Sequence, residues 1–206
     1  MYIRNIALCA GIISLVSCAA FKPTPRVLNP ARAPQVAELN TVAISQFKGP
    51  GGELFRSELE AKLLSENGKQ GIFTVLTSTK KAEGIFSGKV LESSVPYRTY
   101  QKEVEECADK DCKTKRKVNV VCIDRKANFQ VTVSVTKRKT GEIIYSSKFS
   151  GDDTDTYCKN SLSTPITNEA MLQKARTKVI EEIRKDVAPY YTGGELLLFR
   201  PDKWME

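Results

Sequence analysis

The 206-residue chain contains no histidine and a single tryptophan. The lack of histidine excludes Ser-His-Asp and Cys-His nucleophilic mechanisms, and it removes the commonest side-chain ligand of transition metals. Only one long apolar run is present, at the amino terminus, so no membrane-crossing helix is expected elsewhere. No internal repeat is evident. These absences leave few routes to catalysis, and the amino terminus and the cysteines become the informative features.

The amino terminus has the pattern of an export signal. Arg4 supplies a positive charge, and residues 6–16 form an apolar run that is too short to span a bilayer. The run ends in Leu15-Val16-Ser17-Cys18, which resembles the lipobox of bacterial lipoproteins. The resemblance implies that residues 1–17 are removed as a signal peptide and that Cys18 receives diacylglycerol and an amide-linked acyl chain such as palmitate. Several acyl chains together hold a protein stably on a membrane.

The residue after Cys18 bears on the destination. In the lipoprotein family an aspartate at that position usually means retention in the inner membrane, whereas this chain has Ala19. We therefore expect an outer-membrane lipoprotein that faces the periplasm. The alternative is an ordinary secretory signal with a chance cysteine.

Composition describes a globular protein with excess positive charge. Hydrophobic residues make up 41% of the chain and charged residues 27%, and the formal net charge is +8. The charge is explained either by a soluble mixed-charge surface or by attraction to an anionic lipid or cell-wall polymer. Nucleic acid is not expected as a partner of an exported chain.

Four cysteines remain after Cys18, namely Cys107, Cys112, Cys122 and Cys158. An even number in an oxidising compartment predicts two disulfides, for which three connectivities exist. The polar segment from Cys107 to Cys112 suits a tight turn, so we pair these two, which leaves Cys122 with Cys158. A zinc site is the competing interpretation, but the spacing lacks paired CxxC motifs. We expect no metal and no cofactor apart from the lipid.

The rest of the chain divides by pattern into a spacer, a domain and a tail. Residues 18–38 hold four prolines and predict an extended, lipid-anchored spacer, residues 39–189 an α+β domain, and residues 190–206 a carboxyl-terminal tail with a short strand at 195–199. Apolar periodicity predicts a single mixed, mostly antiparallel sheet with two helices on one face, in the order β-α-β-β-β-β-β-α-β. The expected strands cover residues 41–47, 72–77, 84–91, 118–123, 127–137 and 142–149, and the expected helices begin at Glu53 and near Thr167.

The polar segment 92–117 contains the first cysteine pair. Val95, Tyr97 and Tyr100 can prolong the preceding strand into a long projecting arm. In the meander that follows, the strand end near Cys122 and the chain just beyond 149 lie at the same edge, which supports a bond between Cys122 and Cys158.

Several hydrophobic and turn motifs in residues 40–188 resemble a known domain. They are Val42-Ala43-Ile44 before a glycine-rich turn and helix, the segments 71–76 and 82–90, and the segment 139–146. The pattern is similar to the domain shared by CsgG-type curli-secretion lipoproteins, lipoprotein activators of penicillin-binding proteins, and the amino-terminal part of TolB. The resemblance implies a periplasmic interaction domain without catalytic residues. Because segment 92–117 is strongly charged, we expect no pore of the CsgG type.

No group of residues has the pattern of a catalytic or cation site. Segment 48–52 lacks the phosphate-loop consensus and predicts a turn. The aspartates at 152, 153 and 155 lack the glycine and distal glutamate of a calcium loop, so we interpret them as a solvated turn. The glutamates at 103, 105 and 106 are interpreted as exposed charge.

The sequence therefore predicts a non-enzymatic outer-membrane lipoprotein that serves as an interaction or assembly module of an envelope complex, in secretion, surface-appendage or cell-wall machinery. Its partners would be other envelope proteins, in a homo- or hetero-oligomer. The alternative is a small-ligand carrier or an enzyme with an unrecognised site in the α+β domain.

Overall fold

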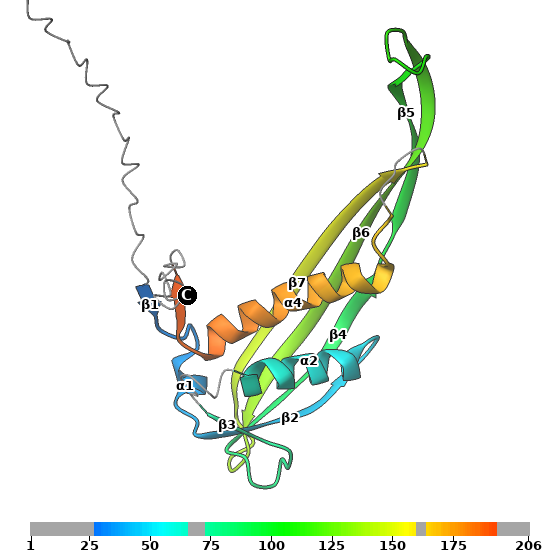
Figure 1. The fold of residues 1–206 in the computed structure, drawn as a ribbon. Helices are drawn as coiled ribbons and strands as arrows, with labels where there is room; N and C mark the ends of the chain where they lie inside the picture. Colours follow the sequence, from blue (N-terminus) through cyan, green and yellow to red (C-terminus); the bar gives the residue numbers. More distant parts are fainter. Residues whose placement is uncertain (1–26, 66–72, 160–163, 193–206) are drawn as a thin grey trace, which may run out of the picture. The chain divides into compact units, whose positions relative to one another are not determined.

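The computed structural model describes residues 27–65, 73–159 and 164–192. The chain divides into two compact units, residues 28–190 and a second unit formed by residues 1–27 with 191–206. A six-stranded sheet lies in the first unit, and β1 and β8 form a two-stranded sheet (Figure 1). The elements are β1 (Val27–Asn29), α1 (Pro34–Ala37), β2 (Thr41–Lys48), α2 (Gly52–Ser65), β3 (Thr74–Leu76), β4 (Gly84–Ser94), β5 (Tyr97–Cys107), β6 (Lys115–Lys137), β7 (Ile143–Cys158), α4 (Asn168–Val187) and β8 (Tyr190–Thr192).

The larger sheet is organised around β6. The strand order is β3-β2-β4-β6-β5, and β7 pairs with the other side of β6. β4 and β5 occupy successive stretches of one side of β6, opposite residues 128–137 and 115–125 respectively. β2 runs parallel to β3 and β4, while all pairings of β6 are antiparallel. The predicted α+β class with a mostly antiparallel mixed sheet is confirmed.

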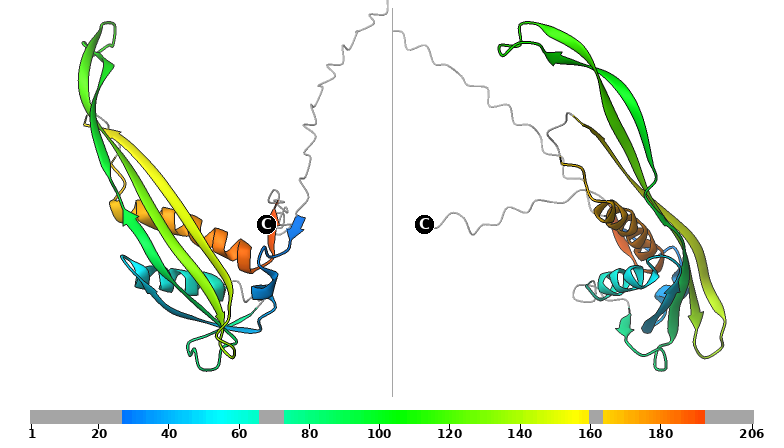
Figure 2. Two further views of the ribbon diagram at one scale, coloured as in Figure 1. Left: turned by 180° about the vertical axis from the view of Figure 1, so that it is seen from behind. Right: turned by 90° about the vertical axis from the view of Figure 1, so that its right-hand side faces the viewer.

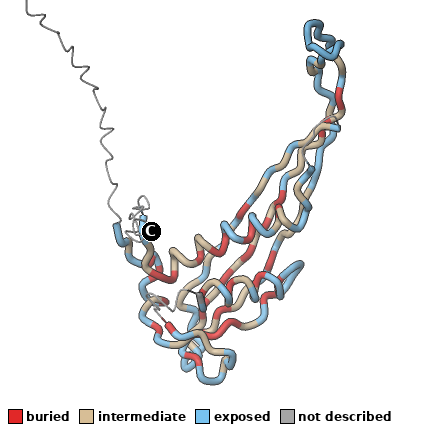
Figure 3. The backbone as a smooth tube through the Cα atoms, in the orientation of Figure 1, coloured by how far each residue is buried: buried red, intermediate tan, exposed pale blue. Residues whose placement is uncertain are grey.

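Two helices, α2 and α4, cover one face of this sheet (Figure 2). In α4, Ala175, Val179, Ile183 and Val187 form an apolar stripe and are all buried. Thr167 caps the helix, since its hydroxyl accepts a hydrogen bond from the amide of Ala170 at 3.2 Å. Figure 3 shows the buried residues concentrated on the strands and helix surfaces that face one another.

The sheet side of the core comes from alternate residues of β6. Ala127, Phe129, Val131, Val133 and Val135 are fully buried. Successive side chains of a strand point to opposite faces, so these five face the helices together. Burial of an aliphatic or aromatic side chain contributes about 2 kcal/mol, which makes this row a main source of the fold's stability.

A buried arginine joins the two helices. Arg176 of α4 is 2% exposed, and its guanidinium donates to both carboxylate oxygens of Glu58 in α2, at 2.9 and 3.1 Å. It also donates to Glu169, two turns earlier on the same face of α4, at 2.6 Å. Burial lowers the pKa of Arg176, but the hydrogen bonds to Glu58 and Glu169 outweigh this and raise it. The guanidinium therefore stays charged and fixes the spacing of α2 and α4.

A close contact between α4 and β7 depends on a glycine. A Cβ atom on Gly151 of β7 would lie 2.2 Å from the carbonyl oxygen of Ala175 and 3.0 Å from a methyl group of Val179. Only a residue without a side chain lets α4 approach β7 so closely.

The structure differs from the expected elements in several places, and a second sheet, β1 with β8, is present in addition to the single sheet that was expected. Residues 118–123 and 127–137 belong to one continuous strand, β6, and the aspartates at 152, 153 and 155, expected in a turn, lie within β7. Part of the expected spacer is ordered, because it contains β1 and α1, and Val36 of α1 is fully buried. The expected strand 195–199 lies outside the described residues.

Candidate interaction site

The most distinctive feature of the sheet is a two-stranded arm, defined here as residues 97–126. It consists of β5, the connecting loop and the first half of β6, in a continuous register from Tyr97 opposite Arg125 to Cys107 opposite Lys115. Figure 1 shows the arm extending past the end of α4, so neither helix covers it. The predicted projecting arm is therefore present.

The arm has a small apolar core on the face opposite to the helices. Val120 and Cys122 are buried, and Tyr100, Val104 and Val118 are half-buried. All five have even numbers, whereas the buried residues of β6 in the helix-covered part have odd numbers. The face of β6 whose side chains are buried thus changes between Cys122 and Ala127, at the base of the arm.

Ion pairs and a disulfide hold the outer half of the arm. Across the two strands, Lys117 pairs with Glu103 at 2.8 Å and Lys115 with Glu105 at 3.5 Å. Such exposed pairs contribute only about 0.5 kcal/mol each, but they define the strand register. At the end of the arm Cys107 is bonded to Cys112, the pairing that the sequence predicts.

The loop at the end of the arm has a defined backbone. The carboxylate of Asp109 accepts hydrogen bonds from the amides of Lys113 and Thr114, each at 2.8 Å. The bond from Lys113 is the largest cause that lowers the pKa of Asp109. Cys112, which is bonded to Cys107, has a φ of 53°, in the left-handed region. The loop thus presents a fixed surface that carries both signs of charge.

At the base of the arm, a second disulfide fastens the end of β7 to β6. Cys122 and Cys158 lie directly opposite each other and are bonded, again as the sequence predicts. The amide of Lys159 donates to the carbonyl of Val121 at 3.0 Å, so 122/158 is a non-hydrogen-bonded pair, in which side chains approach most closely.

Arg125 joins the base of the arm to α4. Its guanidinium pairs with Asp155 of β7 and donates to the carbonyl of Ile166 at 2.5 Å and to the side chain of Asn168 at 3.0 Å. The same group lies 5.1 Å from the ring centre of Tyr157. Because Ile166 and Asn168 flank the start of α4, one side chain connects β6, β7 and the helix. No sequence motif marks Arg125, and its place between two apolar stretches of β6 is its only signal in the sequence.

A shallow hollow of about 460 Å³ lies beside the base on the other face. Arg98 donates to Asp124 at 2.7 Å, and Thr156 donates to the same carboxylate at 2.9 Å. The hydrogen bond from Arg98 is the largest cause that lowers the pKa of Asp124. Tyr97, which is 74% exposed, and Lys126 also line the hollow. Arg98 and Asp124 already pair with each other there, and the hollow is open to solvent.

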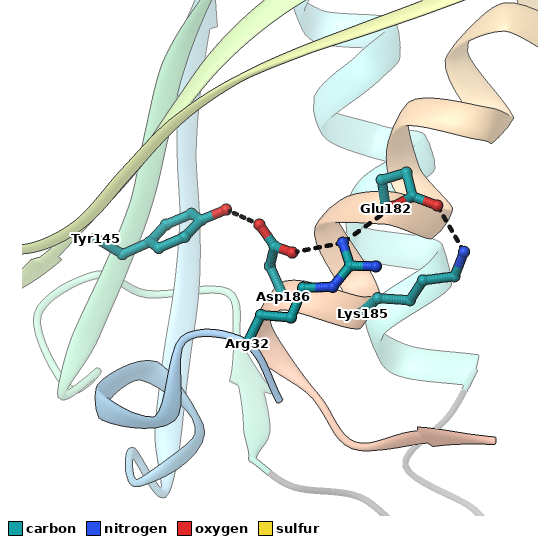
Figure 4. A network of polar contacts seen from close by, with 5 residues as sticks. All are labelled: Arg32, Tyr145, Glu182, Lys185 and Asp186. Atoms are coloured by element: carbon teal, nitrogen blue, oxygen red, sulfur yellow. Dashed lines mark hydrogen bonds and ion pairs between the residues drawn. The ribbon is translucent and has the colours of Figure 1, made fainter. Parts of the chain in front are cut away.

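At the other end of α4, a polar network holds the segment that follows β1 (Figure 4). Arg32 pairs with Glu182 at 3.1 Å and with Asp186 at 3.2 Å. Tyr145 of β7 donates to Asp186 at 2.6 Å, and Lys185 pairs with Glu182 at 2.5 Å. Burial and the bond to Asp186 raise the pKa of Tyr145 far above its usual value, so the phenol remains a donor. The bonds from Lys185 and then Arg32 lower the pKa of Glu182, although burial opposes them.

The remaining predicted residues are not brought together. Cys18 lies outside the described residues. Asp153 lies 3.7 Å from Lys174, Asp155 pairs with Arg125, and Asp152 lies 3.9 Å from Lys126. Within the described ranges no three His, Cys, Asp or Glu side chains are grouped to hold a metal ion, and no helix is long and apolar enough to cross a membrane.

No protein-family model and no curated protein matches the chain. Several solved structures resemble it in fold, at low identity. The PelC dodecamer from Paraburkholderia phytofirmans is 15% identical, with 81% of this chain and 99% of that chain covered and a TM-score of 0.39. Lipoprotein GNA1162 from Neisseria meningitidis is 11% identical, with 70% and 97% covered and a TM-score of 0.39. Protein XCC0632 from Xanthomonas campestris is 12% identical, with 78% and 86% covered and a TM-score of 0.40. Similarity at this level carries no conclusion about function or assembly.

Proposed function

We propose that this chain is a non-enzymatic lipoprotein of the bacterial envelope, anchored to the outer membrane through Cys18, and that the arm binds another envelope protein. The observation that carries the proposal is the construction of the arm. A two-stranded ribbon without a helix against it is marginally stable in water. This one has a disulfide at its end, another at its base, and a guanidinium that joins it to α4.

These features support binding rather than core formation. The arm contributes little to the buried core, whose residues lie mainly beneath α2 and α4. A rigid projecting surface loses little conformational entropy when a partner binds, so fixing its shape in advance favours affinity. The pairs at 103/117 and 105/115 leave charges of both signs exposed along one face, which suits a partner with complementary charge.

The network around Arg32 supports the role of a tether. The segment that precedes α1 leads back toward Cys18, and Arg32 bonds it to α4 at Glu182 and Asp186. A lipid on Cys18 would then be connected to a part of the fold that is fixed to the main helix. The excess positive charge of the chain would keep the module attracted to anionic envelope components.

Site-specific photo-crosslinking in intact cells tests the arm. A photoreactive residue at Lys110 or Gln101, both exposed, should trap one or a few discrete envelope proteins. The matched control is Lys80, an exposed lysine in the turn between β3 and β4. A variant in which Cys107 and Cys112 are both alanine should capture several-fold less from Gln101. Equal labelling at Lys80 and the arm positions, or none at the arm, would contradict the proposal.

Metabolic labelling tests the anchor separately. Labelled palmitate should enter the wild-type chain and be lost in Cys18→Ala, while fractionation of the wild type should place it with the outer membrane. Label that persists in Cys18→Ala would refute lipidation at this residue, whatever the arm binds.

A second candidate function is the carriage of a small ligand, favoured only by the hollow beside Arg98, Asp124 and Lys126. Substitution of Asp124 by Asn would disturb such a site without touching the outer half of the arm. If ligand carriage is the function, Asp124→Asn should impair it while crosslinking from Lys110 is absent. If the arm is the binding element, crosslinking from Lys110 should survive in this variant.

A further inference from the structure

β7 is an edge strand with an unused backbone. It pairs with β6 on one side, and no described strand pairs with its other side. Because the amide of Lys159 donates to Val121, hydrogen-bonded pairs with β6 fall at odd-numbered residues of β7. The N–H and C=O groups of its even-numbered residues therefore point away from the sheet. Among the described residues, only the carbonyls of Ile144 and Asp152 accept a hydrogen bond on that side, from Gln35 and Lys178.

The exposed edge of β7 is long and, beyond its start, regular. β7 has 16 residues and no proline, and its only irregularity in register lies near its start, opposite Val135. The side chains at the even positions from Ser146 to Thr156 are all exposed. Long edges of this kind readily accept a further strand, and soluble proteins generally shorten, bend or cover them.

The exposed charges of β7 complement one another when two copies of the strand are placed antiparallel. We propose that β7 pairs antiparallel with β7 of a second copy of this chain, about a two-fold axis at Ser150. In this register Lys148 of each copy lies opposite Asp152 of the other, so two ion pairs form by symmetry. Ser146 lies opposite Thr154, a favourable hydroxyl pair. The six-stranded sheets of the two copies would become one continuous sheet.

Other registers of the two strands lose these ion pairs. Moving the axis by one residue places Lys148 opposite the uncharged Ser150 or Thr154. Moving it by two residues places Lys148 opposite Lys148, or Asp152 opposite Asp152, and like charges directly opposite each other are destabilising. Only the axis at Ser150 pairs both charges with their opposites.

The charges that would form these ion pairs are exposed and available. Among the described residues, the carboxylate of Asp152 meets only Lys126, at 3.9 Å, while its carbonyl accepts from Lys178. The inference rests on β7 alone. It requires neither the lipid on Cys18 nor a partner for the arm.

Cysteine crosslinking of the full chain in intact cells tests the axis. Ser150→Cys should form a covalent dimer under mild oxidation, seen on a non-reducing gel, because the residue faces its own copy at a separation that a disulfide can bridge. Ser146→Cys alone should not, whereas Ser146→Cys with Thr154→Cys should. Ser87→Cys, on the same face but in β4, is the matched control and should stay monomeric. No more dimer from Ser150→Cys than from Ser87→Cys would overturn the proposal.

Charge reversal then tests the register in the Ser150→Cys background. Lys148→Asp or Asp152→Lys alone should reduce the crosslinked fraction about tenfold, because each places like charges opposite each other. The two together restore opposite charges and should restore the dimer. A dimer that is indifferent to the single changes, or not restored by the double change, would refute this register. Palmitate labelling and crosslinking from Lys110 in the same variants should be unchanged, which separates this test from those of the proposed function.

Discussion

The two disulfides should differ in their contribution to stability, and the difference can be calculated. Cys122 and Cys158 are 36 residues apart in sequence, whereas Cys107 and Cys112 are 5 apart. In the chain-entropy relation, a crosslink stabilises by restricting the unfolded chain, and its effect grows with the logarithm of the loop length. The relation gives about 4 kcal/mol for the bond at the base of the arm and about 2 kcal/mol for the bond at its end.

Urea unfolding of the full chain under non-reducing conditions measures both quantities. The variant with alanine at 122 and 158 should lose about 4 kcal/mol of unfolding free energy, with a further loss because Cys122 is fully buried. The variant with alanine at 107 and 112 should lose about 2 kcal/mol or less, since the end of the arm can open by itself. Equal losses in the two variants, or a loss below about 1 kcal/mol at the base, would refute the reasoning.

Three further predictions concern the remainder of the fold. Arg176→Met should cost about 3 kcal/mol in urea unfolding, because it leaves carboxylates without their buried partner. The matched Arg56→Met removes ion pairs of a guanidinium that is 35% exposed, and it should cost less than about 1 kcal/mol. Gly151→Ala should lower stability by about 2 kcal/mol, since its Cβ would displace α4 at Ala175, and a Tm unchanged from wild type would contradict that packing. The pKa of Glu182 is lowered below 4.5 in the folded state, so its contribution is present above pH 4.5 and lost as the pH falls through the folded-state pKa; Glu182→Gln should flatten the decline in unfolding free energy in that acid range.

Periodicity predicted the class and most elements, and its main error has a physical cause. Buried residues of β6 are even-numbered up to Cys122 and odd-numbered from Ala127 onward. A strand shielded on one face for half its length and on the other face for the rest shows a break in its apolar alternation. The polar residues Asp124, Arg125 and Lys126 lie at that break, so the sequence suggests a turn where one strand continues.

The cysteine pairing could be predicted from the sequence because it depends on the composition of a local turn and on which strand ends share an edge. The contacts of Arg125 and Arg32 could not be predicted in this way. Arg125 reaches Asn168, 43 residues away, and Arg32 reaches Glu182, 150 residues away. A single charged residue carries no periodic signal, and its partner becomes identifiable only when the fold brings the two together.

These two arginines give α4 a role that its apolar stripe alone does not suggest. The helix has 20 residues and a length of about 30 Å. At its start, Arg125 bonds it to the base of the arm through Asn168, and at its end Arg32 bonds it to the segment that follows β1 through Glu182 and Asp186. Both connections are direct ionic or polar bonds to one rigid element. The binding surface proposed for the arm and the segment around Arg32 are therefore both joined to α4, which holds these two parts of the domain at a fixed separation.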